Sequence, residues 1–323
     1  MILLSKNILV LIPVDKKHKK LLEEKAPSAN FTYADGRSVS SAQIQEAHII
    51  IGNPPLNMLK DSISKSSINL EWLQLQSAGV DKYAQILPEN VILTNASGAY
   101  GLAISEYMLG VLLMLLKKLH LYRDNQLGAK WAYEGQVKSI YNSTALIIGV
   151  GDIGGEFAKK LKALGAYTIG MRRKNLNKPD YLDELYTMEH LSELLPRADI
   201  VAMSLPETDL TKKIINRESL KLMKKDAVLI NVGRGSAIDT DALCDALENG
   251  QILGAALDVT DPEPLPKDHR LWKIKNAVIT PHVSGGYSLQ ETYERIVRIC
   301  ANNLEAYVNG NKLVNVVNKS EGY

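Results

Sequence analysis

The segment that most constrains the fold is TALIIGVGDIGGEFAKKLKALGAYTIG, residues 144–170, which holds three glycines in the spacing G-x-G-x-x-G. An apolar run ends at the first glycine, an amphipathic helical pattern starts by Ile153, and a second apolar run closes the segment. An ordinary glycine turn would not require this flanking strand and helix, whereas a pyrophosphate site needs the turn, the close backbone approach and the free N–H groups of the helix start. We therefore expect a dinucleotide site formed by Gly149, Gly151, Asp152, Ile153 and Gly154.

Short β-rich runs alternate with helical patterns along the whole chain, which is typical of α/β folds with parallel sheets. The first series of runs is NILVLI, NFTYA, HIIIG, LEWLQLQ and NVILTN, and the second is ALIIG, AYTIG, DIVAMS, AVLINV, ILGAALDV and NAVIT. Between the series, an apolar pattern predicts one long helix over 101–126, and a last helix is expected over 288–309. The sequence thus predicts an α/β fold with two doubly wound parallel sheets.

Charge and cysteine usage exclude several classes of function. The 38 Lys and Arg residues nearly balance the 36 Asp and Glu residues, so the net charge of +2 gives no reason to expect nucleic-acid binding. No metal-ligand spacing surrounds Cys244 or Cys300, and we expect no metal site and a cytoplasmic protein with reduced thiols. The most apolar helical stretch, 107–116, covers about half of the roughly 20 residues that a membrane span needs. We therefore expect no membrane insertion.

The stretch IGMRRK, 169–174, carries positive charge where a dinucleotide-binding chain usually has one acidic residue. An Asp or Glu there would bind both ribose hydroxyls of NAD, but Met171 occupies the expected position and Arg172 and Arg173 follow it. These cations fit the extra 2′-phosphate of NADP, which a carboxylate would repel. We expect NADP(H) to be preferred and NAD(H) to remain possible, with Arg172 as first contact and Arg173 as a stacking or second ligand. The alternative is a solvated basic turn.

Three segments of the second half place polar side chains directly after predicted strands. INVGRGSAID contains Arg234, ALDVTDPEPLP contains Glu263, and VITPHVSGG contains His282. A hydride enzyme acting on a carbonyl needs a proton donor, a partner that tunes it and a cation for an anionic substrate. Singly, the three could be a surface turn arginine, a solvated loop acid and a capped histidine. Their joint occurrence after a dinucleotide loop favours a catalytic set.

With these motifs in place, the sequence resembles the D-isomer-specific 2-hydroxyacid dehydrogenases. The matching pieces are GVGDIGGE, SLPET, NVGRGSAID, ALDVTDPEPLP and LWKIKNAVITPHVSGG, in the family's order and approximate spacing. The resemblance implies a catalytic triad of Arg234, Glu263 and His282, and an Asp258 that faces the nicotinamide amide. It implies a cofactor cleft lined by Leu205, Pro206, Val232 and Gly233. QSAGVD matches the loop that grips the substrate carboxylate, which implies that role for Ala78, Gly79 and Val80.

The resemblance also implies the domain organisation. A Rossmann NAD(P)-binding domain, 99–287, would be inserted in a flavodoxin-like substrate domain formed by 1–98 and 288–323, so that the last helix returns to the N-terminal domain. Family members pair through the region of the long helix, and we expect a homodimer. The missing ribose acid is shared by NADPH-using members such as glyoxylate and hydroxypyruvate reductases.

The function expected is NADPH-dependent reduction of a small 2-oxoacid to the D-2-hydroxyacid. The substrate's side chain should meet the loop GNPPLN, where Asn53 and Pro54 form a stiff entry, with Tyr100 and Trp272 as further walls or plain packing. Three alternatives stay open: a nucleotide-sensing scaffold of the corepressor type, NAD-dependent oxidation by the same fold, and formate-type oxidation. Formate enzymes of this fold carry Gln where Glu263 stands. The sequence does not select among glyoxylate, hydroxypyruvate, pyruvate and bulkier oxoacids.

Overall fold

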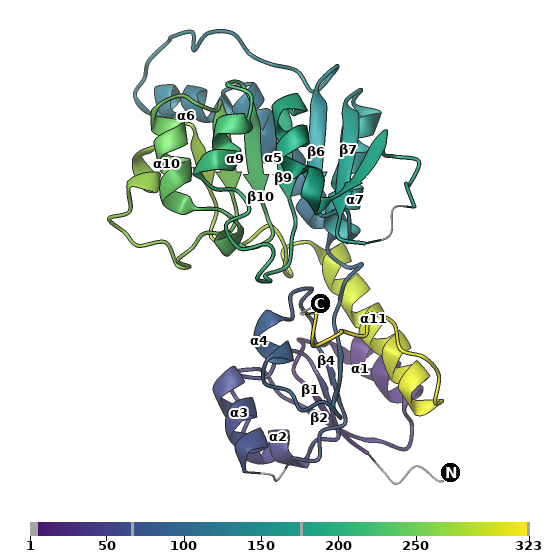
Figure 1. Cartoon of the computed structure of the whole chain (residues 1–323). Coiled ribbons are helices and arrows are strands. Elements are labelled where there is room, and N and C mark those ends of the chain that lie inside the picture. Colours follow the sequence, from purple (N-terminus) through teal and green to yellow (C-terminus); the bar gives the residue numbers. More distant parts are fainter. Residues whose placement is uncertain (1–5, 66–67, 175–176, 322–323) are drawn as a thin grey trace. The chain divides into compact units, whose positions relative to one another are not determined.

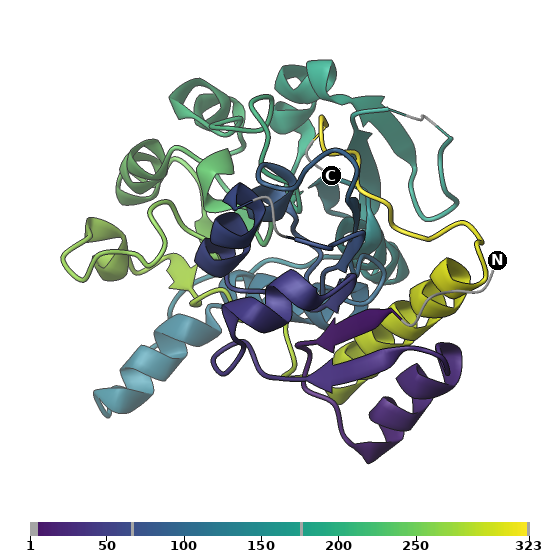
Figure 2. The ribbon, with the colours of Figure 1, turned by 90° about the horizontal axis from the view of Figure 1, so that it is seen from below.

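The computed structural model describes residues 6–65, 68–174 and 177–321, and the chain forms two compact units (Figures 1 and 2). Unit 1 combines Met1–Tyr100 with Gly286–Tyr323, and unit 2 is Gly101–Gly285. The borders expected from the sequence were 98/99 and 287/288. Unit 2 is therefore an insertion in unit 1, and the last helix belongs to unit 1.

Unit 1 is built on a five-stranded parallel sheet with the strand order β2-β1-β3-β4-β5. Its strands are β1 (Asn7–Val10), β2 (Asn30–Tyr33), β3 (Ile49–Ile51), β4 (Trp72–Gln74) and β5 (Ile92–Thr94). Its helices are α1 (Lys16–Lys25), α2 (Ser41–Glu46), α3 (Leu56–Ser64), α4 (Asp81–Ala84) and α11 (Gln290–Val308). This order is that of flavodoxin-like folds, in which ligands bind beyond the carboxyl ends of the strands.

Both faces of the unit 1 sheet are covered, which explains why its strands read as continuous apolar runs. Leu9, Ile50 and Leu73 are register partners across three strands and share one core with the buried residues of α2 and α3. On the other face, the indole of Trp72 stacks on Tyr307 of α11, with 5.1 Å between ring centroids. Helices α1 and α11 lie side by side on that face (Figure 1).

Unit 2 contains a seven-stranded parallel sheet with the order β12-β11-β10-β9-β6-β7-β8. Its strands are β6 (Thr144–Ile148), β7 (Tyr167–Arg172), β8 (Glu184–Thr187), β9 (Ile200–Met203), β10 (Val228–Asn231), β11 (Gly254–Leu257) and β12 (Ala277–Ile279). The chain adds strands outward from β6 to β8 and then resumes on the other side of β6 with β9. This reversal is the switch point of the Rossmann fold, where nucleotides bind.

Helices cover both faces of the unit 2 sheet (Figure 1). The α-helices are α5 (Gly101–Leu116), α6 (Leu119–Leu127), α7 (Asp152–Ala163), α8 (Leu191–Leu194), α9 (Arg217–Leu222) and α10 (Thr240–Glu248). Short 3-10 turns are η1 (Met188–His190), η2 (Leu195–Arg197), η3 (Gly235–Ala237) and η4 (Arg270–Lys273). Helix α5 packs on α7, whereas α8, α9 and α10 share a core with the opposite face of the sheet. The two doubly wound parallel sheets predicted from the sequence are confirmed.

The single helix predicted over 101–126 is wrong, because the chain breaks between α5 and α6. Lys118 adopts a left-handed backbone with φ of 58°, and its ammonium group donates to the carbonyl of Glu134. The ammonium of Lys117 donates to the carbonyl of Lys138 at 2.6 Å. No residue of α6 is buried, so no packing holds α6 in line with α5.

Strand β8 was missing from the predicted series. Its sequence ELYT has no fully buried residue and lies at the sheet edge, where Glu184 pairs with Arg197. An edge strand lacks the apolar run that marks central strands. Within the described ranges, no helix is both long and apolar enough to cross a membrane, and both cysteines are buried and free.

Candidate active site

The glycine loop after β6 is held by direct contact between backbones. Gly149 has φ of +98°, and a Cβ added at Gly154 would collide with the carbonyl oxygen of Gly149. A Cβ at Gly151 would meet nothing within 4 Å, so that position opens away from the protein. Helix α7 starts directly after Gly151, so the N–H groups of its first turn have no acceptor within the helix. The loop thus has the backbone cradle and helix start that a pyrophosphate requires.

Asp152, which was predicted to bind the cofactor, also connects two helices. Its carboxylate accepts a hydrogen bond of 2.8 Å from the N–H of Gly101, the first residue of α5. Its side chain therefore ties the start of α5 to the start of α7. If Asp152 also contacts a nucleotide, its main-chain N–H is the group placed for it.

The end of β7 corrects the register of the cation cluster. Met171 was expected at the position of the ribose acid, but its side chain is fully buried in the core of unit 2. Side chains alternate along a strand, so the next residue, Arg172, is the one that leaves the core. Its Nε donates to the carbonyl oxygen of Val150 in the glycine loop at 3.0 Å. Arg173 is partly buried beside it and Lys174 is exposed.

Arg234 stands in a loop that admits only glycine on either side. A Cβ at Gly233 would lie 2.6 Å from the backbone of Leu205, and one at Gly235 would collide with the backbone of Thr260. The buried Asn231 braces the loop from within, since its side-chain amide donates to the carbonyl of Arg234 at 2.8 Å and its oxygen accepts from the N–H of Gly233 at 3.0 Å. The loop after β10 is thereby packed between the loops after β9 and β11.

His282 and Glu263 form a direct pair. Nδ1 of the imidazole lies 2.7 Å from Oε1 of the carboxylate, and both side chains are about half exposed. No residue in the described ranges hydrogen-bonds to Nε2 of the ring. The pair therefore presents one ring nitrogen outward while the carboxylate fixes the other.

Asp258 holds the segment that carries His282. Its buried carboxylate accepts from the N–H of Val283 at 2.9 Å, the N–H of Ser284 at 3.0 Å and the hydroxyl of Thr280 at 2.5 Å. Its carbonyl accepts from the N–H of His282 at 2.8 Å. His282 has a left-handed backbone with φ of 53°, a conformation that persists where surrounding bonds determine it.

The chain of donors behind Asp258 extends to α5. The hydroxyl of Thr280 lies 2.6 Å from the phenol of Tyr107, which serves as its donor because the Thr280 proton is directed to Asp258. Burial raises the pKa of Tyr107 to about 12, so the phenol keeps its proton at neutral pH. Neither Thr280 nor Tyr107 was among the residues predicted for the site, and no motif marks Tyr107.

The loop predicted to grip the substrate carboxylate follows β4 in unit 1. Asn53 was expected to contact substrate, but both ends of its amide are engaged: Oδ1 accepts from the N–H of Gln76 at 3.0 Å and Nδ2 donates to the hydroxyl of Ser77 at 3.1 Å. Pro54 is buried, and its carbonyl accepts from the phenol of Tyr83 at 2.8 Å. Asn53 thus acts on the loop itself.

The carbonyls of that loop point into the protein. The carbonyl of Ala78 accepts from the side-chain amide of Asn95 at 2.8 Å, and that of Gly79 accepts from the hydroxyl of Ser77 at 2.8 Å. Within the part of the chain that the structure describes, nothing accepts a hydrogen bond from the main-chain N–H of Ala78, Gly79 or Val80. Such donors are suited to an anion.

A family model described as D-isomer specific 2-hydroxyacid dehydrogenase, NAD binding domain, matches residues 109–284. The chain belongs to the D-isomer specific 2-hydroxyacid dehydrogenase family. It is 31% identical over 258 residues to a glyoxylate reductase of Thermofilum pendens, covering 78% of this chain and 76% of that protein. It is 30% identical over 316 residues to the D-3-phosphoglycerate dehydrogenase of Methanocaldococcus jannaschii, covering 97% of this chain and 59% of that one. A solved family structure from Aeromonas salmonicida superposes with a TM-score of 0.84 at 31% identity, covering 98% of this chain and 99% of that chain.

The family model and the glyoxylate reductase confirm the family and the class of enzyme that the motifs predicted. This dehydrogenase is an NAD(P)-dependent oxidoreductase acting between 2-hydroxyacids and 2-oxoacids. The segments that carry the predicted site residues all follow carboxyl ends of parallel strands, where ligands of such folds bind. Among the described residues, no cluster of three metal-ligating side chains is found.

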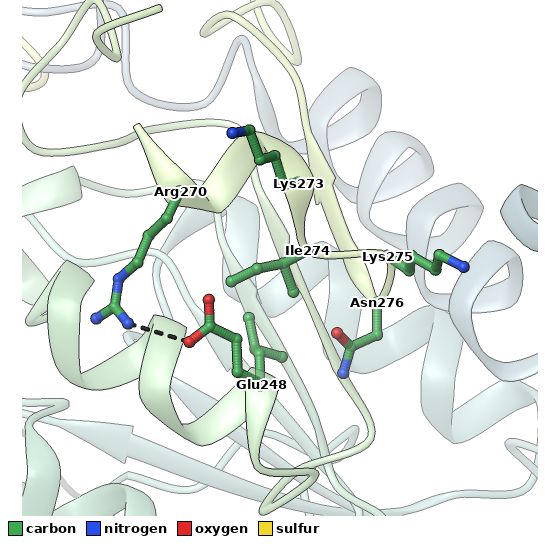
Figure 3. A pocket seen from close by; sticks show the side chains of 7 residues that line it. Glu248, Arg270, Lys273, Ile274, Lys275 and Asn276 are labelled. Carbon is green, nitrogen blue, oxygen red and sulfur yellow. Dashed lines mark hydrogen bonds and ion pairs between the residues drawn. The ribbon is translucent and has the colours of Figure 1, made fainter. Parts of the chain in front are cut away.

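A cavity of about 350 Å³ lies in another part of the dehydrogenase's unit 2 (Figure 3). Its lining residues are Leu247, Glu248, Arg270, Lys273, Ile274, Lys275 and Asn276. Arg270 points to Glu248 and pairs with Asp245 and Glu248 at 2.7 and 3.1 Å. Because the protein's own carboxylates engage this guanidinium, the cavity is not assigned as an anion site. The neighbouring Trp272 donates its indole N–H to the carbonyl of Pro266 at 2.9 Å.

Proposed function

We propose that this dehydrogenase reduces a small 2-oxoacid to the D-2-hydroxyacid with NADPH. The observation that carries the proposal is the His282–Glu263 pair of 2.7 Å at the end of β12, on the same sheet as a glycine loop and an arginine loop. The glyoxylate reductase named above supports a small 2-oxoacid as substrate class.

The loop Gly149–Gly154 would hold the pyrophosphate, since Gly151 leaves an opening and α7 begins beside it. When bound, the nicotinamide nucleotide supplies the hydride. Leu205, Pro206, Val232, Gly233 and Asp258 are the residues expected along the cofactor. Asp258 is an acceptor with three protein donors already on it, and a carboxylate with two oxygens can accept one more, from an amide.

The chain's own residues would manage the substrate's charge and proton. Arg234 binds the carboxylate, because its planar fork suits two oxygens at once. His282, as imidazolium, donates the proton of Nε2 to the oxygen of the reduced carbonyl. Glu263 holds the ring in place from the other side, through Nδ1. The N–H groups of Ala78, Gly79 and Val80 are the further donors expected for the carboxylate.

NADPH is favoured over NADH by the end of β7. Arg172 is the last residue of β7, and its side chain lies outside the core and donates to the glycine loop. A 2′-phosphate bound beside this loop would therefore contact the guanidinium. Arg173 adds a second cation. No acidic residue stands at this strand end to bind the two ribose hydroxyls of NADH.

We also propose that the enzyme is a homodimer, and the exposed apolar side chains support this. Met108, Leu112 and Leu115 of α5 are buried inside unit 2. The large exposed apolar side chains therefore lie after α5 in the chain. Large apolar side chains that are mostly exposed gather in α6 and the segment after it: Leu119, Leu127, Trp131, Tyr133, Val137 and Tyr141. A second copy would cover them. Size-exclusion chromatography with light scattering should give a dimer at micromolar concentration; a monomer would contradict the claim.

The experiment that tests the proposed function is absorbance at the nicotinamide band with NADPH or NADH against a panel of 2-oxoacids. Oxidation of NADPH by at least one small member, with a lower rate for NADH, is expected. Nucleotide binding without oxidation by any member would contradict the proposal.

A further inference from the structure

Two tyrosines from distant parts of the sequence bind the same glutamine. The phenol of Tyr100 donates to the main-chain carbonyl of Gln76 at 2.5 Å, and the phenol of Tyr287 donates to its side-chain Oε1 at 2.5 Å. Gln76 directly precedes the loop 77–80. The carbonyl of Gln76 and the N–H of Ser77 share one peptide plane, so the bond to that carbonyl fixes the plane from which the loop 77–80 starts.

Both tyrosines stand at the borders of unit 1. Tyr100 is its last residue before the chain enters unit 2, and Tyr287 is the second residue after the chain returns. Tyr100 is buried, whereas Tyr287 is 40% exposed and packs edge-on against Tyr293 of α11, with 5.6 Å between centroids. Burial raises the pKa of both phenols, so each remains a protonated donor at any physiological pH.

The remaining contacts of Gln76 show how completely its geometry is fixed. Its N–H donates to Asn53, and the carbonyl of the next residue, Ser77, accepts from the N–H of Ala96 at 3.1 Å. The main chain and the side chain of Gln76 are thus held by separate groups. Two of these bonds come from Tyr100 and Tyr287, which lie at the borders of unit 1. Such multiple anchoring lowers the entropy that the loop would lose on binding an anion.

We propose that Tyr100 and Tyr287 are positioning residues, which act through Gln76 to orient the N–H groups of the loop 77–80 for the substrate carboxylate. The inference rests on the proposed function, because it concerns the loop 77–80, which is proposed to bind the substrate carboxylate. It predicts that the pair sets the affinity for the 2-oxoacid and leaves the affinity for the nucleotide unchanged.

The test compares Tyr100→Phe and Tyr287→Phe with the matched control Tyr307→Phe. The phenol of Tyr307 also makes a 2.5 Å bond, to Glu71, but does not touch Gln76. Each of the two variants should raise KM for the 2-oxoacid about 3- to 10-fold, the range for one lost hydrogen bond. The control should not change KM, and all three should bind NADPH like the wild type.

A double-mutant cycle separates positioning from direct contact with substrate. Gln76→Met removes the acceptor of Tyr287 but keeps the carbonyl that accepts from Tyr100. In that background Tyr287→Phe should have no further effect, while Tyr100→Phe should retain its full effect. If Tyr287→Phe kept its full effect there, the phenol would act on the substrate itself and the inference would be overturned.

A second readout does not depend on turnover. Hydrogen exchange of the peptide covering 74–77, whose Gln76 N–H is bonded to Asn53, should accelerate in both tyrosine variants and not in Tyr307→Phe. If the wild type reduces no 2-oxoacid, the proposed function fails and this exchange decides the positioning claim alone. Unchanged exchange together with unchanged KM would overturn it.

Discussion

Two loops of this protein follow central strands of parallel sheets, yet they are fixed by different means. The glycine loop after β6, the proposed nucleotide loop, is fixed by steric contact between backbones, which leaves no space for a side chain at Gly154. The loop 77–80 after β4, the proposed substrate loop, is fixed by hydrogen bonds that the side chains of Asn53, Asn95, Tyr100 and Tyr287 make with it and with Gln76 before it. A single substitution in the glycine loop should therefore cause a large loss, whereas the loss of one anchor of the loop 77–80 should cause a small one.

Removing the imidazole of His282, the proposed proton donor, should have the largest effect on turnover and should leave both loops intact. His282→Ala should lower turnover by about 10²- to 10⁴-fold, the usual contribution of a general acid. The glycine loop and the loop 77–80 remain intact, so the dissociation constant for NADPH should not change in a fluorescence titration. Turnover near that of the wild type would require another acid.

The steric character of the nucleotide loop is tested by two alanine variants. Gly154→Ala places a methyl group against the carbonyl of Gly149, which should cost about 1–3 kcal/mol in unfolding free energy, measured by urea denaturation. Gly151→Ala adds a methyl group in open space, so its stability should be unchanged while its nucleotide affinity falls. Equal stability of both variants would show that steric contact at Gly154 does not fix the glycine loop.

Arg172→Ala should weaken NADPH binding by roughly 10- to 100-fold, because charge-assisted hydrogen bonds to the 2′-phosphate are lost. The bond from Arg172 to Val150 is lost as well, but that loss affects both nucleotides. The ratio of the two dissociation constants therefore isolates the phosphate contact. An equal loss for NADPH and NADH would refute the assignment.

Glu263→Gln should lower kcat/KM for reduction by roughly 10- to 100-fold, the range for one lost charge-assisted hydrogen bond. The carboxylate at 2.7 Å fixes Nδ1 of His282, and an uncharged amide holds the ring less firmly. Steady-state kinetics with a 2-oxoacid that the wild type reduces measure this loss, and the dissociation constant for NADPH should not change. A kcat/KM identical to that of the wild type would count against the pairing.

The smallest effect is expected for Asn53→Ala, which removes one of several anchors of the substrate loop. KM for the 2-oxoacid should rise by about 2- to 10-fold, since the net worth of such hydrogen bonds is modest. Nucleotide affinity should stay constant. A complete loss of activity in a folded variant would indicate direct contact between Asn53 and the substrate.

The same contrast explains what the sequence could predict. The glycine loop and the strand-end segments of Arg234, Glu263 and His282 are local patterns, and local spacing dictates their geometry. The anchors of the substrate loop come from positions 53, 95, 100 and 287, and no local pattern links them. Folding alone brings Tyr287 to Gln76.

Two errors have a similar origin. The apolar pattern over 101–126 did not show that packing ends at Leu116, so the turn at Lys118 was missed. The position of Met171 was one residue out of register, and in a strand one residue separates core from surface. Residue types alone do not determine this register, because either of two neighbouring residues in the strand could be the last one that the core buries.

The proposed mechanism requires that the imidazole of His282 and the guanidinium of Arg234 bind the same 2-oxoacid. A crystal structure with NADP⁺ and the unreactive analogue oxamate would show whether they do. We predict Nε2 of His282 within about 2.6–3.2 Å of the carbonyl oxygen, with Arg234 on the carboxylate. A bound analogue whose carbonyl lies beyond the reach of that ring nitrogen would rule the mechanism out.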